Sequence, residues 1–260
     1  GFSALNNLTL TATTGNITNS GALYAGKLLT ATATAGTFTN STGTGTIDSD
    51  QDISITANLF RNYNNVTAGR NITIDANTFR NEVVGGDTRA WGAVAWGGNV
   101  HDSTRNWYDF PDDYRTEYYH RDGIANQYFV GGAPSYKPQI IAANTLTIKG
   151  FDAGYNTGGI LSGSTVSLTG NGGTFTNNDL SLHKQTWKQT WEVYTHWIAL
   201  GPETYDDHVT RNDSGAYKTD EYRVSSIGAG IFATTLNAGG FALVNEGSKK
   251  SASTSASSGR

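Results

Sequence analysis

The sequence contains no cysteine and no methionine, and only 4 of its 260 residues are proline. Without cysteine the chain has no disulfide framework, no thiolate metal site and no thiol nucleophile. This absence suits an exported protein that crosses an envelope unfolded, although many cytosolic proteins also lack cysteine. Since no methionine is present to start translation, we expect a fragment or a processed piece of a longer protein. The sequence shows no signal peptide and no apolar run long enough to span a membrane as a helix.

Charged residues are also scarce, at 15% of the chain, and the formal net charge is −4. No basic stripe is present, so we do not expect nucleic acid as a partner. Glycine, threonine, asparagine, serine and alanine dominate instead. This composition differs from that of disordered chains, which favour proline, glutamate and lysine. It is typical of many short strands separated by tight turns.

An internal repeat of three short strands organises most of the chain. The first strand alternates aliphatic residues with threonine, serine or aspartate, the pattern of a strand with one buried face. It recurs at residues 8–12, 29–33, 53–57, 72–76, 146–150 and 166–170. An apolar-x-asparagine motif follows, ending at Asn19, Asn40, Asn62, Asn81 and Asn177. A third segment closes several units, at 23–26, 66–69, 140–143, 160–163 and 227–230. Uninterrupted units start about 19 to 24 residues apart.

A unit of this kind cannot bury its apolar face alone, so it must stack on copies of itself. We therefore predict an all-β fold, a right-handed parallel β-helix of about seven coils. Its aliphatic and phenylalanine side chains would form interior columns. The asparagines would lie at turns, where their amides could bond to one another along the axis. An antiparallel β-sandwich would explain the alternation, but it would not explain a three-part unit of nearly constant length.

Two aromatic-rich excursions interrupt the repeat, after Asn81 and after Asn177. Both breaks follow the same motif, so the two segments should leave the helix at equivalent points two coils apart and could lie beside each other. We predict one β-helix domain over 1–248, with coils at 3–82, 139–182 and 226–248, excursions at 84–137 and 183–225, and a flexible tail at 249–260. The excursions read as β-hairpins or extra strands, and Thr186–Trp197 as an alternating strand or a short helix.

All six tryptophans and all five histidines lie in the two excursions. Tryptophan and tyrosine supply rigid amphipathic contact area, which favours a surface for a receptor or a carbohydrate. The competing interpretation is that these aromatics pack on each other and on the coils as a small satellite core, and both can hold for different residues. The candidate binding residues are Trp91, Trp96, Trp107, Tyr108, Trp187, Trp191 and Trp197.

The acidic residues do not predict a catalytic or metal site. Asp48, Asp50 and Asp52 alternate in a lengthened turn and could hold Ca²⁺, but solvated acids explain such a turn equally. The acids at 112–113 and the 206–208 segment have no spacing that assigns acid and base roles. We therefore expect no enzymatic activity, no catalytic residues, no metal site and no cofactor. A β-helical polysaccharide lyase or hydrolase is the second alternative.

The coils resemble the haemagglutinin repeats of filamentous haemagglutinin and of contact-dependent growth inhibition exoproteins. The resemblance rests on the strand, asparagine and alanine-glycine pattern, as in Ile53–Ala57, Phe60-Arg-Asn62 and Ala68-Gly-Arg-Asn71, and covers most of the coils. It implies a secreted filament on the surface of a Gram-negative bacterium, exported by two-partner secretion through an outer-membrane transporter. The implied function is a structural and adhesive segment, a stiff rod that presents distal binding or toxin modules. A receptor- or glycan-binding module using the excursions is the first alternative.

Overall fold

The computed structural model describes residues 1–85, 88–109, 112–130, 134, 136–200 and 203–246, with the side chains of 198–200 and 203–214 excepted. The predicted tail at 249–260 lies outside these residues. The chain divides into two compact units. Unit 1 comprises Gly1–Thr88, Phe129–Ser181 and Ser226–Arg260, and unit 2 comprises Arg89–Tyr128 and Leu182–Ser225.

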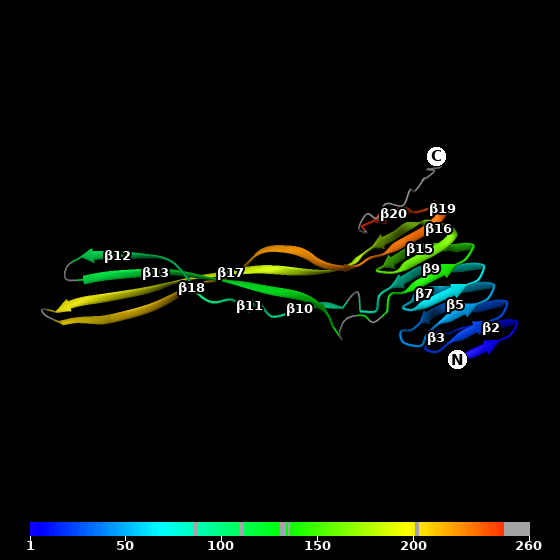
Figure 1. Cartoon of the computed structure of the whole chain (residues 1–260), viewed down its shortest axis with the longest axis horizontal. Coiled ribbons are helices and arrows are strands. Elements are labelled where there is room, and N and C mark those ends of the chain that lie inside the picture. The colour runs from blue at the N-terminus through cyan, green and yellow to red at the C-terminus, as the bar shows by residue number, and fades with distance from the viewer. Residues whose placement is uncertain (86–87, 110–111, 131–133, 135, 201–202, 247–260) are drawn as a thin grey trace. The chain divides into compact units, whose positions relative to one another are not determined.

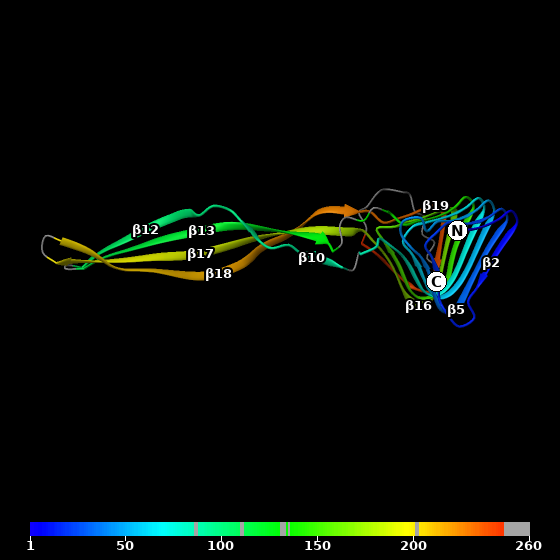
Figure 2. The ribbon, with the colours of Figure 1, turned by 90° about the horizontal axis from the view of Figure 1, so that it is seen from below.

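Unit 1 is a parallel β-helix, as the repeat predicts. Two rows of parallel strands, β1-β4-β6-β8-β14 and β2-β5-β7-β9-β15, meet in the long strand β16. Within the described residues the strands make seven successive coils, stacked in chain order in Figure 1 and viewed nearly along the stack in Figure 2. The strands are β1 Phe2–Ala4, β2 Asn7–Thr11, β3 Ile17–Asn19, β4 Leu23–Ala25, β5 Leu28–Asn40, β6 Ile47–Ser49, β7 Asp52–Asn62, β8 Asn65–Ala68, β9 Asn71–Glu82, β14 Gln139–Ala142, β15 Thr145–Thr157, β16 Ile160–Asn178, β19 Gly230–Gly239 and β20 Ala242–Asn245.

Alternation along each strand sets the interior of the helix. In β7 the side chains of Ile53, Ile55 and Ala57 are buried, whereas the serine and threonine between them are partly exposed. The neighbouring strand β9 pairs with β7 in the same register, so Ile72 and Ile74 stack directly on the two isoleucines. Each column is thus buried only because the coils on both sides supply its neighbours.

A ladder of asparagine side chains runs along the helix. Each amide donates its Nδ2–H to the Oδ1 of the asparagine one coil along, at 2.7–2.9 Å, in six successive bonds. The members are Asn19, Asn40, Asn62, Asn81, Asn156, Asn177 and Asn245. The amide bonds predicted from the repeat are therefore present. They satisfy polar groups that are buried in the middle coils, where an unpaired amide would be costly.

A phenylalanine column lies two residues before this ladder. Phe38, Phe60 and Phe79 stack with ring centroids 5.7–5.9 Å apart. The next coil has Gly154 at this position, and Phe79 instead meets Phe175 of the coil beyond at 6.1 Å. A Cβ on Gly154 would lie only 2.3 Å from Cδ2 of Phe175, so glycine makes the room that lets the column continue across this coil.

The coils resume their pairing after each insert. β9, which precedes the first insert, pairs in parallel with β15, the second coil strand after it, with Asn81 opposite Asn156 and one irregularity between Lys149 and Ala153. The strands on either side of the second insert pair likewise, β16 with both β19 and β20. The chain therefore leaves the stack, returns and resumes winding one coil further on.

Unit 2 is a six-stranded sheet built by both inserts. Its strands are β10 Arg89–Trp91, β11 Ala95–Trp96, β12 Val100–Asp109, β13 Asp112–Phe129, β17 Leu180–Leu200 and β18 Glu203–Ile227. β12 pairs antiparallel with β13, and β13 pairs antiparallel with β17 of the other insert over fifteen residue pairs. Thr186–Trp197 is thus a strand, and Figures 1 and 2 show β12, β13, β17 and β18 side by side. Among the described side chains of unit 2 only Ala125, Gln185 and Trp191 are buried, so unit 2 by itself is a single layer of strands.

Candidate functional site

The register of the unit 2 sheet assigns its side chains to two faces, because successive residues of a strand point to opposite sides. On the first face, Trp107 of β12 lies opposite Tyr114 of β13, which in turn lies opposite His196 of β17. The Tyr114 and His196 rings stack with centroids 4.4 Å apart and an interplanar angle of 3°. Two residues along, Arg105 lies opposite Thr116, and Thr116 lies opposite Tyr194. Three strands thus contribute to one aromatic surface.

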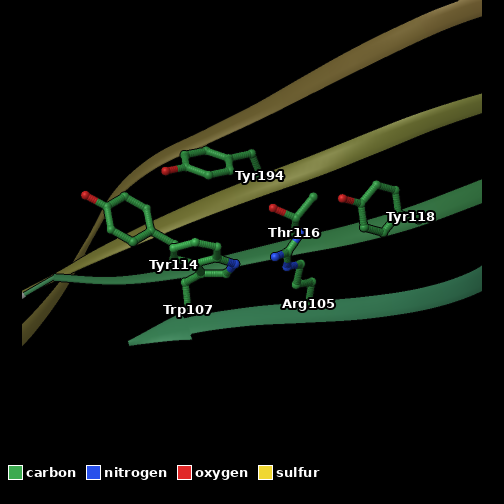
Figure 3. Close-up of a pocket in the computed structure, with 6 residues that line it drawn as sticks. All are labelled: Arg105, Trp107, Tyr114, Thr116, Tyr118 and Tyr194. Atoms are coloured by element: carbon green, nitrogen blue, oxygen red, sulfur yellow. The ribbon is translucent and has the colours of Figure 1, made fainter. Parts of the chain in front are cut away.

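A hollow of about 290 Å³ lies on this first face. Three adjacent strands supply its walls, and Figure 3 shows the side chains from β12, β13 and β17 gathered on one side of the ribbons. The lining residues are Arg105, Trp107, Tyr114, Thr116, Tyr118 and Tyr194. The hollow therefore combines four aromatic rings with one guanidinium group and one aliphatic hydroxyl.

The electrostatics of the hollow are mixed. The Arg105 guanidinium carbon lies 5.1 Å from the centroid of the Trp107 ring, a cation–π distance. Partial burial, followed by the negative charge of Asp112, raises the pKa of the Tyr114 phenol above its ordinary value, so this hydroxyl stays protonated and can donate. The same Asp112 carboxylate lies 3.7 Å from Nε2 of His196, at the margin of the hollow.

The second face carries a different aromatic cluster that packs on itself. Tyr119 and Trp191 stack at 5.7 Å with an interplanar angle of 8°, and the His101 ring meets Tyr119 edge-on at 5.0 Å. Trp191 is only 5% exposed. Cross-strand aromatic pairs of this kind stabilise a sheet, and they are most valuable where no second layer covers it.

Trp96 extends this cluster of the second face. It lies opposite Gly123, where a Cβ would approach its ring to 2.6 Å, so the indole packs directly on the backbone of β13. The Arg121 guanidinium carbon lies 4.8 Å from the Trp96 ring centroid, and its Nε–H donates to Oε1 of Gln189 at 2.7 Å. The ring and the cation are held by contacts within the sheet, whereas Tyr108 on the same face is 79% exposed.

The seven candidate binding residues do not form one surface. Trp107 lies on the first face and is 57% exposed. Trp91 lies apart on the short strand β10. The register places the other five on the second face, opposite odd-numbered residues of β13: Trp96, Tyr108, Trp187, Trp191 and Trp197.

Five of the six lining residues were not among these candidates. The alternation Tyr114-x-Thr116-x-Tyr118 puts three of them on one face and is visible in the sequence, as is Arg105-x-Trp107. Tyr194 could not be found in this way, because its place depends on how β17 of the second insert registers against β13 of the first.

The alternating acids of the early coils already have partners in the structure. Tyr24 donates its hydroxyl to Asp50 at 2.7 Å. Partial burial acts to raise the pKa of Asp52, but hydrogen bonds from Arg70 and Asn71 outweigh it and lower the pKa below its ordinary value. Burial raises the pKa of Asp48. Among the described residues no three histidine, cysteine or acidic side chains gather as metal ligands.

The acids of the excursions fall in two classes. Asp112 and Asp113 point to opposite faces of the sheet, since they lie opposite successive residues of β17, and so cannot act on one substrate as a pair. The acids and histidine at 206–208 have side chains outside the described set.

No helix among the described residues is long and apolar enough to cross a membrane.

The fold and the site define a β-helical protein with an inserted, aromatic-rich antiparallel sheet. Comparison of the chain with models of protein families, with curated proteins and with solved structures gives no match. The functional interpretation therefore rests on the geometry of the two units and on the pattern of the repeat.

Proposed function

We propose that the chain is a structural and adhesive segment of a secreted bacterial filamentous exoprotein. In this proposal the β-helix of unit 1 is a stiff support that belongs to a filament at the surface of a Gram-negative cell, and the sheet of unit 2 is the adhesive element. Secretion through an outer-membrane transporter, and the presentation of further binding or toxin modules, are parts of the same proposal. They are supported by the resemblance of the coils to haemagglutinin repeats.

The single observation that carries the proposal is the continuity of the asparagine ladder across both inserts. Asn81 donates to Asn156, 75 residues away, at 2.8 Å, and Asn177 donates to Asn245, 68 residues away, also at 2.8 Å. A support whose asparagine ladder continues past long insertions can carry a second element without a break in its stacking. Since both inserts contribute strands to one sheet, that second element is a single structure and not two loops.

The stiffness has a physical basis in the coils. Parallel backbone ladders, the asparagine amides and the phenylalanine rings all run along the stacking direction. Bending the stack would lengthen several of these contacts at once on one side. The proposed rod therefore resists bending through its interior, without relying on charged surface contacts.

A deletion experiment separates the two roles. We expect that replacing Arg89–Tyr128 and Leu182–Ser225 by short glycine-serine linkers leaves a soluble β-rich protein with a cooperative unfolding transition, because these residues form a unit of their own. Beads coated with the full chain should adhere to target cells, and beads coated with the shortened chain should not. Aggregation of the shortened chain would contradict the support role, and undiminished adhesion would contradict the adhesive role of unit 2.

A further inference from the structure

We infer that the hollow on the first face of unit 2 binds a carboxylated pyranose, the six-membered sugar ring of a sialic or uronic acid. The inference rests on the proposed adhesive function and names its ligand class. The hollow has a volume of about 290 Å³, just below the range of about 300–1,000 Å³ for small-molecule sites, so it suits a single sugar ring.

The aromatic side chains provide the platform for the sugar ring. The Trp107 indole is 57% exposed and lines the hollow, so its ring is accessible to a ligand. Tyr114, Tyr118 and Tyr194 surround the hollow with further rings and with phenolic hydroxyls (Figure 3). A pyranose has the matching character, because its C–H faces are apolar and its edges carry hydroxyls that accept and donate hydrogen bonds.

Arg105 selects the acid. Among the described residues that line the hollow it is the one that carries a charge, and it lies between Trp107 and Tyr118 in Figure 3. Its guanidinium carbon lies 5.1 Å from the centroid of the Trp107 ring, and a guanidinium group can bind a carboxylate through two parallel hydrogen bonds. The net charge of −4 would repel acidic glycans over the molecule as a whole, so the attraction has to be local.

The charges around the hollow agree with a ligand whose acid group points toward Arg105. Three described acids lie on the same face near its margin: Asp109 and Asp112, which lie opposite each other beyond Trp107 and Tyr114, and Glu192, which lies opposite Tyr118. None of them is among the residues that line the hollow. Asp109 and Asp112 lie four residues along their strands from Arg105 and Thr116, so they disfavour an acid group at the Trp107 end of the hollow and leave Arg105 as the position for it.

The sheet backbone argues for a sugar over an extended peptide. At the hollow, the backbone of β13 is paired on both sides, with β12 and with β17. Peptide recognition by strand addition uses a free edge, which among the described strands at the hollow only the outer side of β12 offers, whereas the hollow itself lies over the paired β13 and is walled by side chains. Rings that stack flat on side chains are therefore the better match.

The test measures binding by calorimetry on the full chain with 3′-sialyllactose, trigalacturonate and lactose. We expect at least one acidic glycan to bind, and to bind at least about tenfold more tightly than neutral lactose, the factor of one charge-assisted contact. Trp107→Ala should abolish binding. Tyr108→Ala is the matched control, because this exposed neighbour lies on the opposite face. Arg105→Gln should erase the preference for acidic glycans, and Arg121→Gln on the second face should not.

The outcomes separate this inference from the proposed function. If neither acidic glycan binds, or if binding survives Trp107→Ala, the proposed site is overturned. Equal affinity for lactose and the acidic glycans would overturn the role of Arg105. If the full chain still adheres to cells in these cases, the proposed function stands with another ligand. If acidic glycans bind but unit 2 is dispensable for adhesion, the site stands and the proposed function fails.

Discussion

Replacing Asn81 by alanine should destabilise the β-helix far more than the same change at the end of the ladder. Asn81 accepts a bond from Asn62 and donates one to Asn156, both at 2.8 Å, donates a longer bond of 3.3 Å to the carbonyl oxygen of Ile160, and is fully buried. Losing the two ladder bonds alone costs about 2 kcal/mol at about 1 kcal/mol each. Asn156 Oδ1 then stays buried without this donor, which adds about 1–3 kcal/mol. The expected total is about 3–5 kcal/mol.

Asn245→Ala is the matched control. Asn245 is exposed and accepts a single bond from Asn177 in the last coil, so its loss should cost about 1 kcal/mol or less, because water can replace the lost partner. Guanidinium unfolding followed by far-ultraviolet circular dichroism measures both changes. Since all six tryptophans lie in the two segments of unit 2, their fluorescence reports separately on that unit. Equal losses in the two variants, with unchanged denaturant slopes, would refute the argument that burial makes the middle of the ladder contribute more stability than its end.

Three further changes probe other contacts. Gly154→Ala should destabilise by about 1–3 kcal/mol in chemical unfolding, because the new methyl would overlap a stacked phenylalanine ring, whereas Gly239→Ala, with open space around its Cβ, should be neutral. Trp191→Ala should cost about 3 kcal/mol and shift the fluorescence transition of unit 2, since its ring is buried. The pKa of Asp52 is lowered in the folded protein, so its ionised carboxylate contributes to the free energy of unfolding above the ordinary pKa of 3.8. This contribution is lost as the pH falls through the folded-state pKa. Asp52→Asn should therefore make the free energy of unfolding, measured by chemical unfolding at several acid pH values, fall less steeply with decreasing pH.

The β-helix could be predicted from the sequence because its information is local and repeated. Each coil carries its own alternation and its own asparagine, and stacking only places equal positions side by side. Asn156 was the harder member to detect. The apolar residue that precedes the other asparagines is replaced there by Gly154, and only the structure shows that Phe79 and Phe175 close over the gap.

The site was harder to predict because its information is not local. Alternation within β13 places Tyr114, Thr116 and Tyr118 on one face, but it cannot say which strand lies beside them. The partner β17 belongs to the other insert, and a shift of its register by one residue would move Tyr194 to the second face. Aromatic content alone therefore identified the two segments that form the sheet, but it could not assign their residues to one face or the other.

The two faces differ in how their aromatic rings are held. On the second face most rings contact one another across strands and the cation of Arg121 is bonded to Gln189, while Tyr108 at the end of β12 stays exposed. A single-layer sheet needs such a face, because no second layer buries its side chains. On the first face Trp107 stays largely exposed and lines a hollow with Arg105, although burying the indole against a neighbour would have stabilised the sheet more. The proposed glycan site depends on this exposed tryptophan and on the arginine 5.1 Å from its ring.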